Sequence, residues 1–402
     1  MNIINPHRHA EASYAGDGSF AMEFTTTAAN TTVYLPIRSS DTSGKLVFDD
    51  GTSDVIGNPD QATHTFTNAG IYIIKYYGTA SKLEWHGTLS TANKQFLTKI
   101  LDWGITGATS AKFQYCSSLI SVASNLESTT TDLSYCFGSL SSAGNPDVTT
   151  LDVSNVTNMK NMFQQSRGFN QDIGDWDVSS VTNMASMFYG ARAFNQDLNN
   201  WDVSSVVAFN YMFFFANDFN GDISDWTFST NSVDMRGMFL YAVDFNQDIS
   251  GWDTSNVTKM AQMFQVATSF TQDISSWDTS NVTVFGSMFS RNTSANPDVS
   301  SWDTSSVTQF GAMFDRATSA NPDMSSWNFS SGNNYTNFLR SSGISTTNYD
   351  GFLNRLNAQR ITYSLTGRAI GDIPSTYTTS VSGAARTALL ANGWTFTDDG
   401  AV

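Results

Sequence analysis

Apolar side chains recur at fixed places along the middle of the chain, with a spacing of 25 residues and a single step of 26. Each unit follows the pattern W-D-x-S-x-V-T-x-M-x-x-M-F-x-x-A-x-x-F-N-Q-D-I. One tryptophan marks each unit, and Leu151 holds the same place one unit earlier: Trp176, Trp201, Trp226, Trp252, Trp277, Trp302 and Trp327. A unit this short cannot bury its own apolar face, so it must stack on copies of itself. The period therefore predicts a repeat solenoid.

Three short patterns predict the elements inside a unit. The runs "VTNM" and "FNQDI" are each long enough for one brief strand. The run "MASMFYGA" places apolar residues three and four apart, which is typical of a helical turn. Each coil is therefore predicted as strand, short helical turn, strand, with Asn and Asp in the turns between them.

The segments on either side of the repeats have other patterns. Alternating apolar residues in "FAMEFTTT", "TTVYLPI", "GKLVFDDGT" and "THTFTNAGIYIIKYYG" predict a small antiparallel β-sandwich over residues 19–90, after a tail or docking segment at 1–18. Repeats, weaker at first, are expected over residues 91–340. Residues 341–402 should form a cap, with helices at "NYDGFLNRLNAQR" and "SGAARTALLANG" and a strand at "WTFTDD".

The Trp, Met and Phe ladders have two interpretations. They could offer a platform for carbohydrate, or they could fill the interior of the stacked coils. Their retention in every coil favours core packing. The two cysteines, Cys116 and Cys136, hold different places in their coils, and both are predicted to be buried apolar filling.

The 402-residue chain has a net charge of −16, which bears on the partners that it can bind. No local basic cluster offsets it, so binding to nucleic acid is not expected. No run approaches the ~18 apolar residues of a membrane span, so membrane insertion is not expected. Two cysteines cannot build a disulfide framework.

Catalysis has little support in the sequence. The four histidines, at positions 7, 9, 64 and 86, adjoin no nucleophile, and nucleophile elbow, P-loop, dinucleotide and Cys/His metal motifs are absent. His7 and His9 could contact a metal or act as polar docking residues. The prediction is a protein that is not an enzyme and needs no cofactor.

Aspartates form two ladders. One holds Asp172, Asp197, Asp222, Asp248, Asp273, Asp298 and Asp323, and the other holds Asp177, Asp202, Asp253, Asp278 and Asp303. Calcium between coils would explain the first ladder, with Asp172 to Asp273 as its ligands. Alternatively, each carboxylate accepts backbone N–H bonds within its own turn. The second interpretation is favoured, because the dense Gly and Asp of calcium-binding nonapeptide repeats is missing.

The units differ most at the two positions after "MF". These are polar or mixed in most coils, but three consecutive coils carry apolar residues there, and one more aromatic residue lies nearby: Tyr189, Tyr211, Phe214, Phe215, Leu240 and Tyr241. Coils that stack in register would gather them into one apolar patch, and such patches usually mark an interface. The prediction is contact with another chain, a fibre protomer or a partner. Alternatively, a flanking segment covers the patch.

These residues carry a resemblance. Units such as "NVTNMKNMFQQSRGFNQDIGDWDVSSVTNM" closely resemble the repeat of bacterial surface proteins and lipoproteins, a relative of BspA-like leucine-rich repeats. The run "AKFQYCSSLISV" looks like the BspA-like form itself. The segment "GKLVFDDGTSDVIGNPDQATHTFTNAGIYIIKYYG" resembles a polycystic-kidney-disease (PKD) type sandwich, with "FDDGT" in place of its usual W-G-D-G-T.

The resemblance implies a mainly β fold with short helical turns: a right-handed, leucine-rich-repeat-like solenoid, preceded by a small antiparallel sandwich and closed by a small α/β cap. It also implies a non-enzymatic protein displayed on a surface for binding or structure. Partners would be other virion or surface proteins, or a host-surface receptor or glycan.

The N-terminus lacks the basic and then apolar pattern of a signal peptide. This favours a phage virion component, such as a tail or head fibre that attaches to the host, over a bacterial cell-surface adhesin. A purely architectural capsid or tail decoration protein is the third alternative. Analogy with phage fibres implies a homo-oligomer, commonly a trimer.

Overall fold

The computed structural model describes residues 17–38, 44–49, 52–55, 62–85, 94–104, 106–140 and 145–402. It contains strands, many turns and, within those residues, two helices, so the chain is mainly β. None of the described helices is long and apolar enough to span a bilayer. The chain divides into two compact units, Met1–Ser180 and Val181–Val402, which are described separately.

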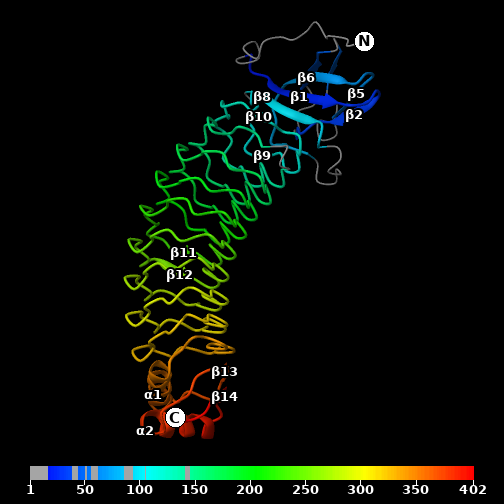
Figure 1. The fold of residues 1–402 in the computed structure, drawn as a ribbon. Helices are drawn as coiled ribbons and strands as arrows, with labels where there is room; N and C mark the ends of the chain where they lie inside the picture. Colours follow the sequence, from blue (N-terminus) through cyan, green and yellow to red (C-terminus); the bar gives the residue numbers. More distant parts are fainter. Residues whose placement is uncertain are drawn as a thin grey trace. The chain divides into compact units, whose positions relative to one another are not determined.

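A six-stranded sheet dominates the first unit (Figure 1). Its strands, in spatial order, are β10 (Ser121–Val122), β8 (Leu97–Asp102), β1 (Phe20–Thr26), β6 (Gly70–Tyr77), β3 (Lys45–Phe48) and β4 (Ser53–Val55). All neighbours are antiparallel except β10 and β8. The strands predicted before residue 90 are confirmed, and the sheet also includes β8 and β10 beyond that position.

Two smaller strand pairs also belong to the first unit. Strands β2 (Thr31–Tyr34) and β5 (Thr63–Phe66) are antiparallel, whereas β7 (Leu83–Glu84) and β9 (Ala111–Lys112) are parallel. From β9 onward, the backbone of each coil bonds to the next, as in the 2.9 Å bond from the Phe113 N–H to the Cys136 oxygen.

The prediction that both cysteines, Cys116 and Cys136, are buried is confirmed. Burial raises the pKa of both thiols.

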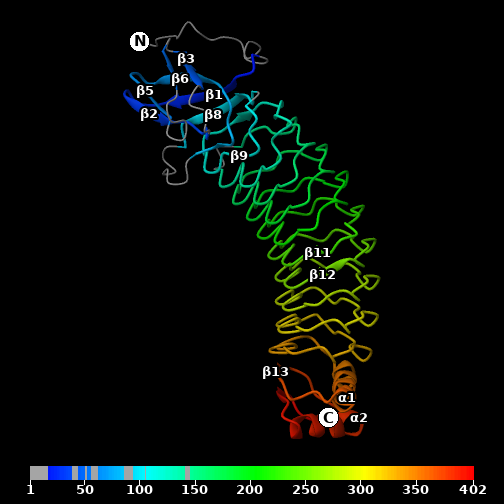
Figure 2. The same ribbon diagram turned by 180° about the vertical axis from the view of Figure 1, so that it is seen from behind.

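The second unit begins as a series of coils that bond to one another, seen from both sides in Figures 1 and 2. Parallel bridges join equivalent residues 25 or 26 positions apart, such as Asn183 with Ala208 and Ala208 with Asp234. The pattern lengthens into true strands in β11 (Val233–Asp234) and β12 (Val257–Lys259). The strand predicted at "VTNM" is therefore mostly a single bridged residue.

The helical turn predicted at "MASMFYGA" is wrong, because this segment is a series of tight turns. The N–H groups of Met187, Tyr189 and Ala191 donate to oxygens three residues back, at 2.9–3.1 Å. The alternate N–H groups, as at Phe188, donate to the next coil at 2.7–3.0 Å. So short a helix is marginal on its own. Bonding outward satisfies the same groups and joins the coils.

The run "FNQDI" was predicted as a strand and forms none. Asn and Asp side chains of this run accept hydrogen bonds from backbone N–H groups of the neighbouring coil. Oδ1 of Asn195 accepts from the Asn220 N–H at 2.8 Å, and Oδ1 of Asn220 accepts from the Asn246 N–H at 2.8 Å. Oδ1 of Asp197 accepts from the Asp222 N–H at 2.9 Å. In this part of each coil, side-chain oxygens thus accept the coil-to-coil bonds that carbonyl oxygens accept elsewhere.

The interior of the second unit consists of stacked side chains, as predicted for the Trp, Met and Phe ladders. The indole rings of Trp201, Trp226 and Trp252 follow one another at 6.5 and 6.4 Å, with planes within 5°. A phenylalanine column beside them has ring separations of 5.5–5.7 Å, for example between Phe188 and Phe213. These rings are almost fully buried, so they are unavailable as a platform for a ligand.

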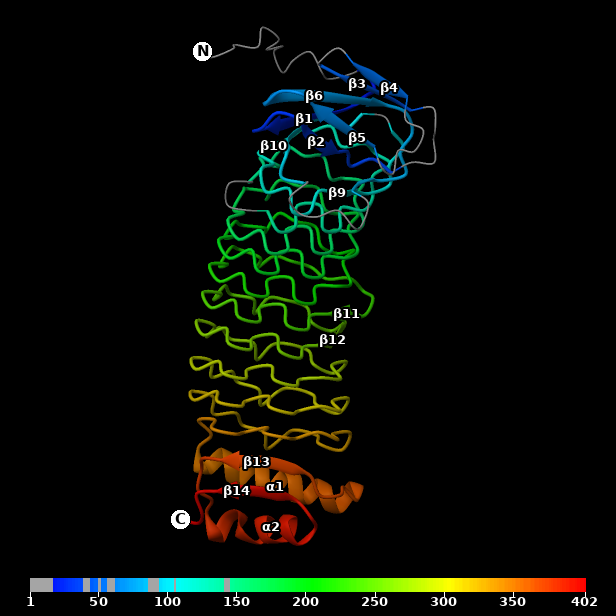
Figure 3. The same ribbon diagram turned by 90° about the vertical axis from the view of Figure 1, so that its right-hand side faces the viewer.

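Helices and strands alternate at the end of the second unit, in the order α1 (Thr346–Tyr363), β13 (Ala369–Ile373), α2 (Thr379–Ala391) and β14 (Thr395–Asp398). Both predicted helices and the predicted strand are confirmed. The strands are parallel neighbours. Figure 3 shows β13 and β14 at the level of α1, with α2 beyond them at the end of the unit.

Helix α1 covers the last coil. The Phe352 ring lies 5.6 Å from that of Phe329 and 5.9 Å from that of Phe338. Gln359, which is buried, accepts the Phe329 N–H and donates to the Trp327 oxygen at 2.7 Å. The helix therefore supplies the hydrogen bonds that a further coil would otherwise provide.

Candidate binding surface

The backbone places a column of side chains at the edge of the second unit. Each coil has two residues with positive φ, four positions apart, such as Tyr211 at 60° and Phe215 at 56°. A left-handed conformation costs a non-glycine residue on the order of 1 kcal/mol, so glycine is the residue that folding alone would favour there. Gly190, with φ 69°, holds the place equivalent to Phe215. Larger side chains at this place are therefore not explained by the backbone.

The aromatic residues at this edge contact one another across three coils. The Phe214 ring meets that of Tyr189 edge-on at 4.6 Å and stacks on that of Phe215 at 4.5 Å. Phe215 in turn stacks on Tyr241 at 4.4 Å. Tyr211 lies 5.9 Å from Phe214. All five side chains are partly exposed, and we call these five residues the aromatic cluster.

A hollow of about 340 Å³ opens within the aromatic cluster. Its lining is Ser186, Tyr189, Tyr211, Phe214, Leu240 and Gln262. Every one of these side chains is uncharged, and hydroxyl and amide groups lie beside the rings. Leu240, predicted to belong to the exposed patch, is only 5% exposed and is a buried part of this lining. The other five residues of the predicted patch form the aromatic cluster.

Two residues that the sequence analysis did not single out position Tyr211. A Cβ atom at Gly237 would lie 2.5 Å from the Tyr211 ring, so only glycine lets the ring lie against this coil. The Tyr211 hydroxyl then reaches Oε1 of Gln262, two coils further on, at 3.3 Å. Nε2 of Gln262 donates to Oε1 of Gln265 at 3.1 Å. The sequence signal was that Gly237 is the one glycine among the residues that hold its place in the other coils, from Tyr135 to Asn337.

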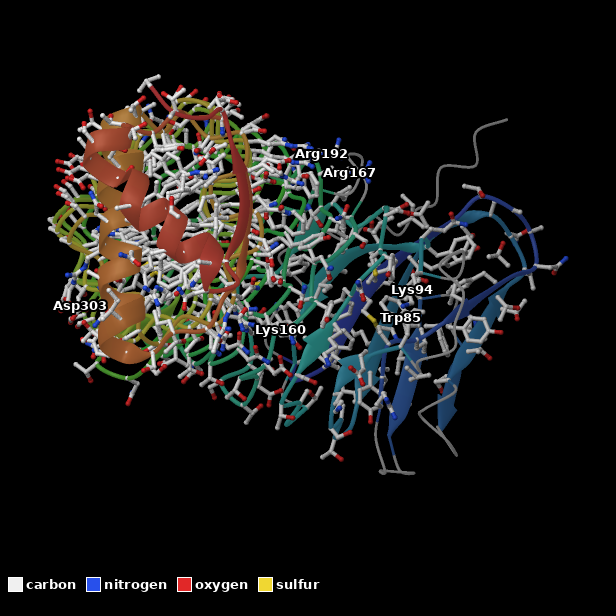
Figure 4. The ribbon with its side chains drawn as sticks, turned by 90° about the horizontal axis from the view of Figure 1, so that it is seen from below. Trp85, Lys94, Lys160, Arg167, Arg192 and Asp303 are labelled. Carbon is white, nitrogen blue, oxygen red and sulfur yellow. The ribbon has the colours of Figure 1, made fainter. Side chains whose placement is uncertain are left out.

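The aspartate ladders lie in Asx-type turns. In the first, Asp172, Asp222, Asp248 and Asp273 each accept the backbone N–H two residues later at 2.9–3.1 Å. Asp197 accepts from the Asp222 N–H instead. The second ladder makes the same two-residue bonds, from Asp177 to Asp303; Asp303 lies at the outer side of the coils in Figure 4. Among the described residues, no group of three or more His, Cys, Asp or Glu is placed to hold a metal ion.

These bonds alter the acidity of several aspartates. A hydroxyl bond from Ser179, together with its N–H, lowers the pKa of Asp177. Bonds from Ser300 lower the pKa of Asp298 in the same way. The Ser250 N–H lowers the pKa of Asp248. The bonds therefore stabilise the ionised carboxylates without a metal.

In the first unit, Lys94 lies beside two aromatic rings, and His64 is the one histidine that the structure describes. The Lys94 ammonium lies 5.7 Å from the centre of the Trp85 ring and 5.4 Å from that of Tyr115 (Figure 4). Burial lowers the pKa of Lys94. The His64 ring stacks on Phe48 at 3.7 Å. Positions 7, 9 and 86, where the other histidines stand, lie outside the described residues.

One family model matches the chain twice, over residues 131–251 and 233–352. Together the matches cover more than half of the chain and include every residue of the aromatic cluster. The chain matches no curated protein and no solved structure at a significant level. The chain belongs to the family described as "Mycoplasma protein of unknown function, DUF285".

Proposed function

We propose that the chain is a non-enzymatic binding protein displayed on a surface, and that the aromatic cluster is its contact with a partner. The observation that carries the proposal is the set of ring contacts joining Tyr189, Phe214, Phe215 and Tyr241 at a partly exposed edge. Soluble proteins seldom leave connected aromatic groups in contact with water unless they form an interface. Two of the four, Phe215 and Tyr241, also occupy left-handed positions that favour glycine.

The remaining features fit a scaffold that presents this edge. Each coil bonds to the next through backbone and side-chain groups, which supports a right-handed, leucine-rich-repeat-like solenoid as the carrier of the surface. In the first unit, the Phe48–His64 stack joins the two motifs that resemble a PKD-type sandwich. The setting that we propose is a phage particle, as a tail or head fibre, with a bacterial cell-surface adhesin or an architectural decoration protein as alternatives.

A paired substitution tests the proposal. We expect Phe214→Ser with Phe215→Ser to abolish self-association, measured by light scattering, or adhesion of the labelled full-length chain to bacterial cells. The matched control is Gln164→Ser with Gln165→Ser, which changes the same two places in another coil. If the Phe pair leaves both assembly and adhesion at the control level, the aromatic cluster is not the contact surface.

A further inference from the structure

We infer that the edge bearing the aromatic cluster binds a linear acidic polysaccharide along the stacked coils. The rings would contact the apolar faces of sugars, and two arginines further along would contact carboxylates. The inference rests on the function proposed above and names the ligand class of the same surface. Its evidence is a single column of equivalent residues: Gly190, Phe215, Tyr241, Val266, Arg291 and Arg316.

The column is defined by its backbone. Each of the six residues has a positive φ, between 56° and 69°. Each backbone N–H donates to a carbonyl oxygen of the next coil at 2.6–3.0 Å, as from Phe215 to Leu240 and from Arg291 to Asp315. The five side chains, after Gly190, therefore leave the backbone from equivalent positions, one coil apart. Along this line, the side chains change from aromatic at Phe215 and Tyr241 to cationic at Arg291 and Arg316.

The arginines are available for a ligand. Both Arg291 and Arg316 are exposed, and the ion pairs among the residues that the structure describes include neither of them. The neighbouring carboxylate of Asp315 is already held by Arg340, through bonds of 2.6 and 2.8 Å. In a chain with a net charge of −16, these guanidinium groups offer a local attraction for anions.

The chemistry of the edge favours a sugar polymer over an acidic peptide. A peptide strand that extends a sheet needs free backbone donors, but every N–H of the column is already bonded to the next coil. The polar side-chain groups that line the hollow are all hydroxyls or amides, from Ser186, Tyr189, Tyr211 and Gln262. These suit a ligand with both hydroxyl groups and apolar ring faces. A regular coil spacing of ~4.8 Å also suits a polymer with a regular repeat.

Glycine substitutions test the inference without unfolding the coils. Because the column is left-handed and Gly190 already occupies it, Phe215→Gly with Tyr241→Gly, and Arg291→Gly with Arg316→Gly, remove side chains that the backbone does not need. Ser341→Gly is the matched control, since Ser341 is exposed, has φ 54° and lies one unit beyond Arg316. Calorimetry would measure binding of the full-length chain to oligogalacturonate and to the same oligomers after carboxyl reduction.

The Arg pair variant should bind oligogalacturonate about fivefold more weakly, as expected for two exposed ion pairs, and should bind the reduced oligomers as the control does. The aromatic pair variant should weaken binding of both oligomers. Equal affinity of the unaltered chain for both oligomers would overturn the inference, as would tighter binding of oligoglutamate, which indicates a peptide ligand. These outcomes leave the proposed function standing, because that function fails only if the Phe214 and Phe215 substitutions have no effect.

Discussion

The indole Nε1 of Trp226 donates a 2.8 Å hydrogen bond to the carbonyl oxygen of Leu198, 28 residues earlier in the chain. Both groups are buried. The same bond recurs at Trp252, Trp277, Trp302 and Trp327, at 2.8–3.2 Å. The tryptophan of each coil is therefore both core filling and a polar connection to the coil before it.

Trp226→Phe should destabilise the second unit. The Leu198 carbonyl keeps the Trp201 N–H at 3.0 Å but loses the indole donor. The lost bond costs about 0.5–1.5 kcal/mol, and the space that the smaller phenyl ring leaves in the core adds to the loss. Urea unfolding, followed by circular dichroism, measures the change. Tyr189→Phe is the control, because it removes a hydroxyl from a partly exposed ring. A Trp226→Phe loss no larger than that of the control would show that the indole bond contributes nothing.

The core was predictable from the sequence because burial repeats with the period. Each Trp, Met and Phe of the pattern must face inward in every coil, so a substitution in one unit is visible against its neighbours. The edge was predictable for the same reason, and the five residues of the aromatic cluster do meet. Leu240 was wrongly predicted to be exposed, because its place in the coil, which it shares with the partly exposed Tyr189 and Phe214, does not determine how far its neighbours cover it.

Other features depend on three-dimensional contacts that periodicity does not specify. Apolar residues three and four apart at "MASMFYGA" suit a helix and a series of turns equally well, and bonding to the next coil decides between them. At "FNQDI", Asn195 and Asp197 bond through their side chains, so no strand forms. The reach of Tyr211 to Gln262 over Gly237 spans three units, beyond any pattern within one.

The aspartate turns predict how stability depends on pH. The folded-state pKa values of Asp177, Asp248 and Asp298 are lowered below 3.8, so their contribution is present above that pH and is lost as the pH falls through the folded pKa values. Urea unfolding between pH 6 and pH 3 should show this loss.

Asparagine keeps the turn acceptor but does not titrate. We therefore expect Asp177→Asn with Asp298→Asn to give a shallower decline in stability below pH 4 than the unaltered chain. Asp244→Asn is the control for lost charge, because Asp244 is exposed and its side chain makes no hydrogen bond to the described residues. An equal decline in all three chains would mean that these turns do not cause the pH dependence.

Removal of calcium should leave stability unchanged. The carboxylates of Asp172, Asp222, Asp248 and Asp273 each bond within their own turn, which offsets the repulsion between stacked charges without an ion. Melting temperatures with excess EGTA and with added calcium should agree within about 1 °C, since an ion bound only to the folded chain would raise them with the logarithm of its free concentration. A fall of several degrees in EGTA would assign the ladder to calcium.

Gln359→Leu should weaken the attachment of α1 to the last coil. The buried amide holds two backbone groups at once, the Phe329 N–H and the Trp327 oxygen. Leucine has a similar volume but leaves the Phe329 N–H unpaired, which costs about 1–3 kcal/mol, whereas the Trp327 oxygen keeps its 2.7 Å bond from Arg355 Nε. Because α1 also packs on Phe329 and Phe338, the helix should open locally before the coils unfold.

Hydrogen exchange in Gln359→Leu should then speed up in residues 346–363 and in the last coil, with earlier coils unchanged. Ala358→Leu adds an apolar side chain at an exposed neighbouring position and should leave exchange as it is; if the two variants exchange alike, Gln359 does not hold the end of the stack.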